Sequence, residues 1–302
     1  MKVGVIGTGL MGWHHARVYR ELGVDLVGVA DTDMTRAEEV ADKYQTKAYT
    51  DYTQLLEQGL DAVSVVVPPR LHAEIAVCVA DHGINMLVEK PISDSVESAK
   101  QIINAAKKAK LILMVGYIER FNPTVQKLKQ IIDEGVLGDL IVLSSRRVGP
   151  FVTRVKDIGI TMDVASHDID IARYLTNMEP VEVLAKSNAV KNEKGDCALM
   201  ILDFGRITAS IEVNWFTPHK VRTLVVTGTD GIAYIDYMKQ SVKIFNSDWE
   251  MEPKIEKAEP LFLELKHFLE SVEQGKESMV SGEDALKTLE IALKIERSSF
   301  KQ

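Results

Sequence analysis

The sequence has little cysteine and no long apolar run, and these shortages exclude several classes of protein. Its two cysteines, Cys78 and Cys197, stand far apart inside apolar stretches. Such cysteines are typical of small buried hydrophobic residues in a reducing compartment rather than of a disulfide or metal site. No uninterrupted apolar run approaches the roughly 18 residues of a membrane span, and a strand pattern starting at Lys2 leaves no room for a signal peptide. We therefore expect a cytoplasmic protein without a bound metal.

The chain also has fewer basic than acidic residues. Lysine and arginine number 36 against 44 acidic residues, which gives a formal net charge of −8. The chain lacks the basic stripe that a nucleic-acid-binding protein needs, and its acidic balance argues against adhesion to anionic membranes. We expect neither nucleic acid nor a membrane as partner. With 302 residues, 46% of them hydrophobic, the chain is long enough for about two domains.

A glycine-rich turn stands near the start of the chain, where KVGVIGTGLMG breaks an apolar run at Gly7, Gly9 and Gly12. Without Cβ atoms, Gly7 can make a tight bend, Gly9 can let a pyrophosphate approach, and Gly12 can let the next helix lie close to the sheet. That helix begins near Leu10 and Met11 and presents unpaired N–H groups to phosphates. The pattern predicts a dinucleotide-binding turn.

An acidic residue follows at the distance that such a fold requires. The apolar run VDLVGVA ends at Asp31, 19 residues beyond Gly12. A carboxylate there can accept hydrogen bonds from both adenosine ribose hydroxyls and would repel a 2′-phosphate, which favours NAD over NADP. Arg36 lies near enough to weaken that preference. Alternatively, Asp31 caps the helix that begins around Thr35, and the two roles are compatible.

The pattern of predicted strands and helices changes near residue 120. Strand and helix patterns alternate up to about residue 119, with continuous apolar runs such as VSVVV, which predicts an N-terminal doubly wound parallel sheet covered on both faces. Beyond Asn122, alternating strands follow one another with few helices. This predicts a C-terminal α+β domain with a large, open, mostly antiparallel sheet. The expected domains are 1–120, for the dinucleotide, and 121–302, closed by helices of which Ser281 caps the last.

Lys90 directly follows a buried strand pattern, at the carboxyl edge of the predicted sheet, where open α/β sheets bind ligands. Its ammonium could donate to a substrate hydroxyl and to the nicotinamide ribose, stabilising the negative charge that grows as an alcohol loses its proton. Glu89 is a natural counter-ion, and Pro91 fixes the backbone. The alternative is a solvated loop lysine, the usual environment of this residue.

Asp163, His167 and Asp170 are spaced at i, i+4 and i+7. On one α-helix all three would project from one face, with roughly 5–6 Å between the Cβ atoms of successive members. Because the other faces are apolar, this polar stripe must face a partner, a ligand or trapped water. His167 could then take a hydroxyl proton while a carboxylate one turn away orients the ring or the substrate. Alternatively, His167 is a satisfied core residue.

A cluster of cations precedes that helix, formed by Arg146, Arg147, Arg154 and Lys156. Guanidinium groups match the paired oxygens of diphosphates and carboxylates, so the cluster predicts an anionic substrate. Adjacent side chains of a strand point to opposite faces, so we expect at most one of Arg146 and Arg147 to line the site. The alternative is that these cations pair with acidic side chains on the surface or at a subunit interface.

Four segments resemble, in order and spacing, the Gfo/Idh/MocA oxidoreductases: VSVVVPPRLHAEIA, VEKP at 88–91, GYIERFNP at 116–123 and DVASHDID at 163–170. The resemblance implies a two-domain NAD(P)-dependent enzyme with a Rossmann domain, acting mainly on sugars, inositols and sugar nucleotides. It also implies a homodimer or homotetramer formed through the second sheet. Lys90, Asp163 and His167 would be its catalytic residues.

The same resemblance suggests roles for further residues. Pro68, His72 and Glu89 would lie beside the cofactor together with Lys90, and Tyr117 and Glu119 would lie near the nicotinamide and the substrate. His15 matches a usual family histidine and would pack beside the cofactor.

Within the family, RRVGPF with VASHDIDIARYL resembles archaeal-type UDP-N-acetylglucosamine 3-dehydrogenases, which oxidise the sugar C3 hydroxyl. Under this reading Arg146 or Arg147 would meet the diphosphate. Ala165 stands where the family usually has glycine. The alternatives are a dehydrogenase of another sugar or an inositol, an NAD-dependent glycosidase that oxidises C3 transiently, and a regulator that senses NAD(P) without catalysis.

Overall fold

The computed structural model describes residues 1–151 and 158–299, and the chain divides into two compact units. Each unit combines two stretches of chain: the first unit consists of Met1–Ile118 and Leu261–Lys287, and the second of Glu119–Pro260 and the chain from Thr288 onward.

This division differs from the predicted one at 120/121. The first boundary lies two residues earlier, and residues 261–287 belong to the first unit rather than to the second. Helix α8 (Pro260–Gln274) in this segment buries Leu265 and Phe268 completely. The backbone of Val280 accepts a hydrogen bond of 3.0 Å from the N–H of Val115. The amphipathic pattern predicts the helix, but it does not say which core the apolar face joins.

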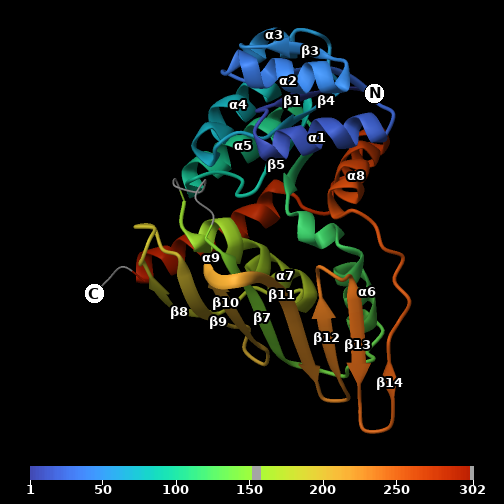
Figure 1. The fold of residues 1–302 in the computed structure, drawn as a ribbon, viewed down its shortest axis with the longest axis vertical. Helices are drawn as coiled ribbons and strands as arrows, with labels where there is room; N and C mark the ends of the chain where they lie inside the picture. The colour runs from blue at the N-terminus through green and yellow to red at the C-terminus, as the bar shows by residue number, and fades with distance from the viewer. Residues whose placement is uncertain (152–157, 300–302) are drawn as a thin grey trace. The chain divides into compact units, whose positions relative to one another are not determined.

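The first unit contains a six-stranded sheet in the order β3-β2-β1-β4-β5-β6, with every pair parallel. Figure 1 labels four of these strands, β1, β3, β4 and β5. Its strands are β1 (Lys2–Ile6), β2 (Asp25–Ala30), β3 (Lys47–Tyr49), β4 (Ala62–Val65), β5 (Asn85–Glu89) and β6 (Leu113–Gly116). Its other helices are α1 (Leu10–Glu21), α2 (Met34–Tyr44), α3 (Tyr52–Leu56), α4 (Pro69–Asp81) and α5 (Val96–Ala109). The strand order reverses between β1 and β4, where doubly wound folds bind their ligands. The predicted N-terminal fold is confirmed.

The second unit contains an eight-stranded sheet in the order β14-β13-β12-β11-β7-β10-β9-β8, in which only β7 and β10 pair in parallel. Its strands are β7 (Leu140–Pro150), β8 (Glu182–Asn188), β9 (Cys197–Asp203), β10 (Thr208–Asn214), β11 (Phe216–Gly228), β12 (Ile232–Asp236), β13 (Ser241–Phe245) and β14 (Glu250–Met251). The helical segments that lie wholly or mainly in this unit are η1 (Ile118–Phe121), α6 (Pro123–Asp133), η2 (Thr161–Ala165), α7 (Ser166–Thr176) and α9 (Gly282–Ser299), although Ile118 and residues 282–287 of α9 belong to the first unit. The predicted mostly antiparallel sheet is confirmed.

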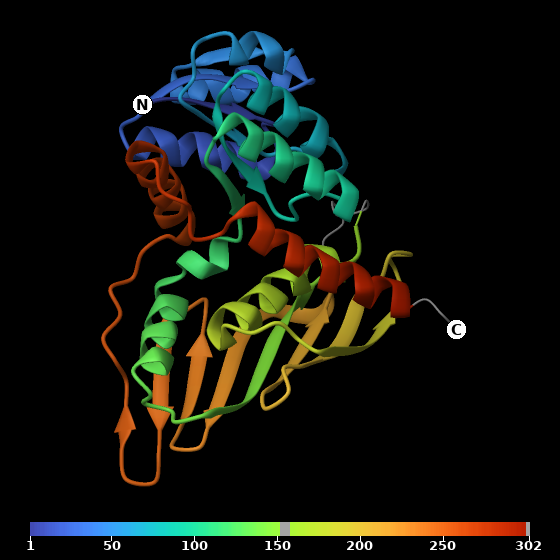
Figure 2. The same cartoon turned by 180° about the vertical axis from the view of Figure 1, so that it is seen from behind.

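The two faces of this sheet differ in composition. Along β9, Ala198, Met200 and Leu202 are buried, whereas Leu199 and Ile201 between them are 57% and 41% exposed. Helices α6 and α7 lie on the buried face (Figure 2). The alternation therefore gives one face that packs on helices and one that remains open, as the sequence pattern predicts.

Local signals in the sequence account for several helix starts. The side chain of Asn122 accepts a hydrogen bond of 3.1 Å from the N–H of Thr124, and Pro123 occupies the first helical position of α6. Ser281 caps α9 as predicted, accepting from the N–H of Asp284 at 3.2 Å.

Both cysteines are free thiols, half-buried rather than fully buried. No helix within the described part of the chain is long and apolar enough to cross a membrane.

Candidate active site

The glycine turn that joins β1 to α1 has the geometry that the sequence predicts. Gly7 adopts a φ of +94°, and a Cβ atom there would lie 2.2 Å from the carbonyl oxygen of Val66. A Cβ at Gly12 would lie 1.8 Å from the carbonyl oxygen of Gly7. Around Gly9, by contrast, a Cβ would meet no described atom within 4 Å. The fold itself requires the first and third glycines, while the second leaves the space that a closely approaching pyrophosphate needs.

The start of α1 is also suited to an anion. Gly9 is the N-cap residue, no side chain caps this end, and the first turn holds no acidic residue. Leu10 is 54% exposed and Met11 is half-buried. The first N–H groups of a helix lack partners inside the helix and carry partial positive charge. The turn and the helix start together fit the phosphates of a dinucleotide.

Asp31 directly follows the neighbouring strand β2, and its side chain binds the glycine turn. Its Oδ2 accepts hydrogen bonds from the backbone N–H and the hydroxyl of Thr8, at 2.8 and 3.0 Å. The alternative that Asp31 caps the next helix is wrong, because Asp33 caps α2 by accepting from the N–H groups of Thr35 and Arg36. Arg36 forms an ion pair with Asp33 at 3.2 Å. Its guanidinium is therefore held by a carboxylate other than Asp31.

Lys90 lies just beyond β5, and its neighbour Glu89 is held inside the first unit. Glu89 is 9% exposed, and its carboxylate lies so close to Gly116 that a Cβ there would be 3.1 Å away. It accepts hydrogen bonds from His15 Nε2 at 3.0 Å and from the backbone N–H of Lys90 at 3.1 Å. Burial opposes ionisation, but the interactions with His15 and Lys90 outweigh it and hold the pKa of Glu89 below its ordinary value.

The side chain of Lys90 is half-buried, and the Lys90–Pro91 peptide bond is cis. The charge of Lys90 helps to lower the pKa of Glu89, so the two side chains interact electrostatically. The expectation that Glu89 contacts the cofactor is not supported, because its carboxylate points into the core.

His72 and Pro68, which are both predicted to lie beside the cofactor, differ in burial. Pro68 is exposed directly before α4. His72 is fully buried, with Nε2 2.8 Å from the carbonyl oxygen of Val67 and Nδ1 3.1 Å from that of Pro91. Burial lowers the pKa of His72 despite these acceptors. The contact of His72 with the cofactor stays a prediction, although each ring nitrogen lies within hydrogen-bond distance of a backbone carbonyl oxygen.

The segment that carries Asp163 and His167 is not one regular α-helix. Residues 161–165 form a π-helical turn, in which the N–H of Ser166 donates to the carbonyl of Thr161, and α7 follows. Asp163 and His167 are both half-buried, whereas Thr161, Met162 and Ala165 are buried. The two predicted catalytic side chains are thus partly accessible, although the helical geometry was predicted wrongly. Single π turns inside helices are frequent at functional sites.

Asp170, the third member of the predicted stripe, has a different environment. Its carboxylate forms a bidentate ion pair with Arg120, at 2.8 Å from Nε and 2.5 Å from Nη2, and both side chains are 5% exposed or less. A carboxylate held in this way supports packing rather than facing a ligand. The prediction of one continuous polar face is therefore wrong at its last member.

Arg146 and Arg147 point to opposite faces of β7, as predicted, but neither is available to a substrate on the α7 face. Arg146 lies on the open face, 50% exposed, with Nε 2.9 Å from Glu212. Arg147 is 5% exposed and donates to Asp168 and Glu119, each at 2.7 Å. Burial alone would lower the pKa of Arg147, but these two carboxylates raise it above its ordinary value. The structure thus favours the alternative, in which these cations pair with acidic side chains.

Tyr117 and Glu119 are also buried. Tyr117 is 1% exposed just beyond β6. Glu119 belongs to η1 and accepts from Arg147 and from Asn122 at 3.2 Å. Burial raises its pKa, but Arg147 outweighs that effect and holds the pKa below its ordinary value. Substrate contacts by these side chains are not supported by this packing. Arg154 and Lys156 lie outside the described residues.

Sequence reasoning missed Asp168 and Arg222. Arg222 lies opposite Arg147 in the register of β11 and β7, and its side chain is 41% exposed. Its guanidinium is 3.7 Å from Glu119 and interacts electrostatically with Asp163. Burial and the neighbouring Arg147 lower the pKa of Arg222. The alternation of its strand could have placed Arg222 on the buried face. No sequence pattern showed that the carboxylates of Glu119, Asp163 and Asp168 would lie near the guanidinium groups of Arg147 and Arg222.

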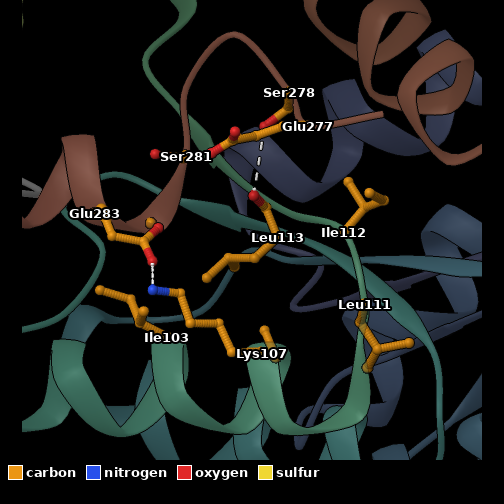
Figure 3. Close-up of a pocket in the computed structure, with 11 residues that line it drawn as sticks. Ile103, Lys107, Leu111, Ile112, Leu113, Glu277, Ser278, Ser281 and Glu283 are labelled. Carbon is orange, nitrogen blue, oxygen red and sulfur yellow. Dashed lines mark hydrogen bonds and ion pairs between the residues drawn. The ribbon is translucent and has the colours of Figure 1, made fainter. Parts of the chain in front are cut away.

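A pocket of about 220 Å³ lies elsewhere in the first unit, between α5 and the segment that links α8 to α9 (Figure 3). Ile103, Leu111 and Leu113 supply apolar lining, and Lys107 pairs with Glu283 at its rim. It contains none of the predicted site residues and opens beside the first residue of β6. That is the amino edge of the parallel sheet, opposite to the edge where dinucleotides bind.

Residues 1–117 match a domain described as "Oxidoreductase family, NAD-binding Rossmann fold", and residues 125–234 match the Gfo/Idh/MocA C-terminal domain. The chain belongs to the Gfo/Idh/MocA oxidoreductase family. Its first unit is the family's NAD-binding domain, and the glycine turn, Asp31 and Lys90 all lie within it. Asp163 and His167 lie in the matched C-terminal domain.

Relatives of this Gfo/Idh/MocA protein act on several hydroxylated compounds. UDP-N-acetylglucosamine 3-dehydrogenase of Acidithiobacillus ferrooxidans is 30% identical over 98% of this chain and 96% of its own length. A solved structure of that enzyme superposes with a TM-score of 0.94 over 100% of this chain and 99% of its own, at 28% identity. The scyllo-inositol 2-dehydrogenase (NAD(+)) of Bacillus subtilis is 32% identical over 97% of this chain and 92% of its own length.

Proposed function

We propose that this Gfo/Idh/MocA oxidoreductase is an NAD-dependent dehydrogenase of a sugar nucleotide, and that it oxidises the C3 hydroxyl of UDP-N-acetylglucosamine. The observation that carries this proposal is the similarity to UDP-N-acetylglucosamine 3-dehydrogenase, which extends over 98% of the chain at 30% identity. The glycine turn, with its space at Gly9, and the partly accessible side chains of Asp163 and His167 are compatible with such a reaction.

For the cofactor, Gly7, Gly9 and Gly12 would hold the pyrophosphate against the start of α1, with the backbone at Leu10 and Met11 as donors. Asp31 would accept from the ribose hydroxyls, since each carboxylate oxygen can accept more than the bonds that Thr8 and Asp33 make. A carboxylate at this position disfavours a 2′-phosphate, which supports NAD over NADP. The bound dinucleotide would supply the hydride acceptor.

For catalysis, we propose that Lys90, Asp163 and His167 act on one hydroxyl group. His167 takes the hydroxyl proton, because imidazole titrates near neutral pH, and Asp163 orients the ring or the substrate. Lys90 donates to the same oxygen and stabilises the negative charge that develops on it. Lys90 is suited to this role because Glu89 and the backbone hold its segment while its side chain remains partly accessible.

A neutral polyol is the second candidate substrate. The scyllo-inositol 2-dehydrogenase of Bacillus subtilis is 32% identical, and the arginines expected to bind a diphosphate are paired. Arg147 and Arg222 share their surroundings with Glu119, Asp163 and Asp168, so this cluster carries no excess of positive charge. An inositol would need no cation from it, whereas a sugar nucleotide would need its diphosphate bound by other groups.

We also propose that the enzyme forms a homodimer or homotetramer through the open face of the second sheet. Leu184, Ile201 and Tyr234 lie in one row across that face and are 41–56% exposed. Ser144 and Ser210 occupy the centre of the row, where the hydroxyl of Ser210 donates to that of Ser144 at 3.1 Å. Exposed apolar patches of this kind mark interaction surfaces. A monomer in light scattering would reject this proposal. A cytoplasmic location remains a prediction.

The deciding experiment follows NADH absorbance with NAD and a panel of UDP-sugars, free sugars and inositols. We expect steady production of NADH with UDP-N-acetylglucosamine and with no other compound of the panel. Turnover with inositols alone would establish the second candidate. Cleavage of a glycoside without net NADH would indicate the NAD-dependent glycosidase activity, and NAD binding without any turnover would indicate a regulator.

A further inference from the structure

We propose that two buried histidines, His15 on α1 and His72 on α4, are positioning residues that fix Lys90 from two sides. The segment Glu89–Ile92, which carries Lys90, is called the lysine turn below. The inference rests on the proposed role of Lys90 in catalysis. Both histidines lie in the first unit, and each is 0% exposed. The sequence suggested cofactor contacts for both, but their partners lie inside the protein.

His15 holds the lysine turn through Glu89. Nε2 lies 3.0 Å from Glu89 Oε1, and an ionised carboxylate can only accept, so Nε2 carries a proton. Nδ1 lies 3.0 Å from the hydroxyl oxygen of Ser64, which in turn lies 2.6 Å from the hydroxyl of Tyr19. With neutral His15, Tyr19 donates to Ser64, Ser64 donates to Nδ1, and Nε2 donates to Glu89. Every donor in this buried chain then has an acceptor.

The bonds of Glu89 transmit this arrangement to Lys90. Oε1 accepts from His15, while Oε2 accepts from the backbone N–H of Lys90 at 3.1 Å. Gly116 on the adjacent strand leaves room for the carboxylate, since a Cβ there would crowd it at 3.1 Å. A carboxylate held at both oxygens fixes the backbone from which the Lys90 side chain leaves. Loss of the imidazole would leave a buried carboxylate without one of its donors, which is costly.

His72 holds the other end of the lysine turn. Nδ1 lies 3.1 and 3.2 Å from the carbonyl oxygens of Pro91 and Ile92, and Nε2 lies 2.8 Å from that of Val67 beyond β4. A neutral ring donates through one nitrogen only, so either tautomer bonds to one side and packs against the other. In both cases the ring fills the space between the end of β4 and the turn.

The two histidines therefore act on opposite ends of a segment of four residues. Catalysis by a positioned group is sensitive to small displacements, and a shift of about 1 Å can reduce the rate by about 10²-fold. Cofactor binding at the glycine turn depends on other residues. We therefore expect that removing the contacts of His15 or His72 with the lysine turn lowers kcat much more than it raises KM for NAD.

The test compares His15→Gln with His15→Phe. The amide of glutamine can donate to Glu89 and accept from Ser64, whereas phenylalanine can do neither. We expect His15→Phe to lower kcat by at least about tenfold with KM for NAD changed less than about threefold, and His15→Gln to retain kcat within about threefold of wild type. His82→Phe, an exposed histidine at the end of α4, is the control and leaves kcat unchanged. Equal kcat in His15→Phe and wild type would overturn the proposal.

A second readout does not need turnover. Acetylation of Lys90 by acetic anhydride, followed by mass spectrometry relative to exposed Lys107, reports how the turn presents its amine. We expect the ratio to change at least about threefold in His15→Phe and to return toward wild type in His15→Gln. If no substrate is found, the proposed function fails, and the acetylation ratio still shows whether His15 positions Lys90. If His15→Phe does not fold, Ser64→Ala removes one hydrogen bond of the ring, and an unchanged ratio there would overturn the proposal.

Discussion

The two units hold their reactive side chains by different physical means. In the first unit, Lys90 is fixed by backbone bonds and by a buried chain of Tyr19, Ser64 and His15 that ends on Glu89. In the second unit, α7 is held to its surroundings by buried ion pairs, Arg147 with Asp168 and Arg120 with Asp170. The first arrangement depends on tautomers and shape, and the second depends on charge.

This difference bears on how well the site residues of each unit could be predicted from the sequence. A glycine turn and a strand end are local features, so the positions of the glycine turn and of Lys90 could be predicted from the sequence, whereas the burial of Glu89 and His72 could not. Charged residues near α7 were predicted to face a ligand, but most of them neutralise one another inside the unit. Burying a charge is tolerated when it is paired, so a cluster of both signs beside a helix can be structural.

The largest expected effect comes from breaking a buried pair in the second unit. Arg147→Met should lower the free energy of unfolding by about 3–5 kcal/mol, because Asp168 and Glu119 would remain buried without their cation. Urea unfolding followed by tryptophan fluorescence, with buried Trp215 in this unit, measures it. The neighbouring exposed pair is the control, and Arg146→Met should cost about 0–1 kcal/mol. Equal costs would contradict the distinction between the two faces of β7.

The next effect tests whether each unit supplies part of the chemistry. Lys90→Ala and His167→Ala should each reduce kcat by a factor of about 10² or more, because each removes a group that acts on the reacting hydroxyl. NAD affinity, measured by titration, should stay within a few-fold of wild type. Lys107→Ala and His82→Ala, both at exposed residues, are the matched controls. Wild-type rates in either variant would reject that residue as catalytic.

The dependence on charge also predicts a response to acid. The pKa of Glu119 lies below its ordinary value, so its pairing with Arg147 stabilises the fold above that value and is lost as the pH falls through the lowered pKa. At pH 7, Glu119→Gln should cost about 1.5–3 kcal/mol. The difference in unfolding free energy between wild type and variant should shrink as the pH is lowered from 5 to 3. A difference that does not depend on pH would show that Glu119 acts by shape alone.

The smallest effect concerns the cofactor. Asp31→Ser removes the carboxylate that repels a 2′-phosphate, so the ratio of kcat/KM for NAD over NADP should fall by about tenfold, or about 1.4 kcal/mol. The variant also loses bonds to Thr8, so its stability should be measured in parallel. Asp51→Ser, at the cap of α3, is the control and should leave the ratio unchanged. An unchanged ratio in Asp31→Ser would show that this residue is not at the ribose.

Local patterns predicted most elements of the fold. Apolar runs broken by glycine, alternation along the later strands and cap residues such as Ser281 act over a few neighbouring residues, so each can be read from the chain. The π turn before α7 could not be read in this way. Its hydrogen bond from Ser166 to Thr161 changes the spacing of Asp163 and His167 without a signal in residue type.

The amino-acid sequence by itself determined the family, the class of cofactor and the two kinds of sheet, because those signals are local motifs, and it is also the source of the residues that we propose for catalysis. Only the tertiary structure decided that His15 pairs with Glu89 and His72 lies against Pro91, that Arg147 pairs with Glu119 and Asp168, and that residues 261–287 join the first unit. These facts are pairings between distant segments. A side chain's partner is set by where the chain returns, and that depends on the packing of the whole unit.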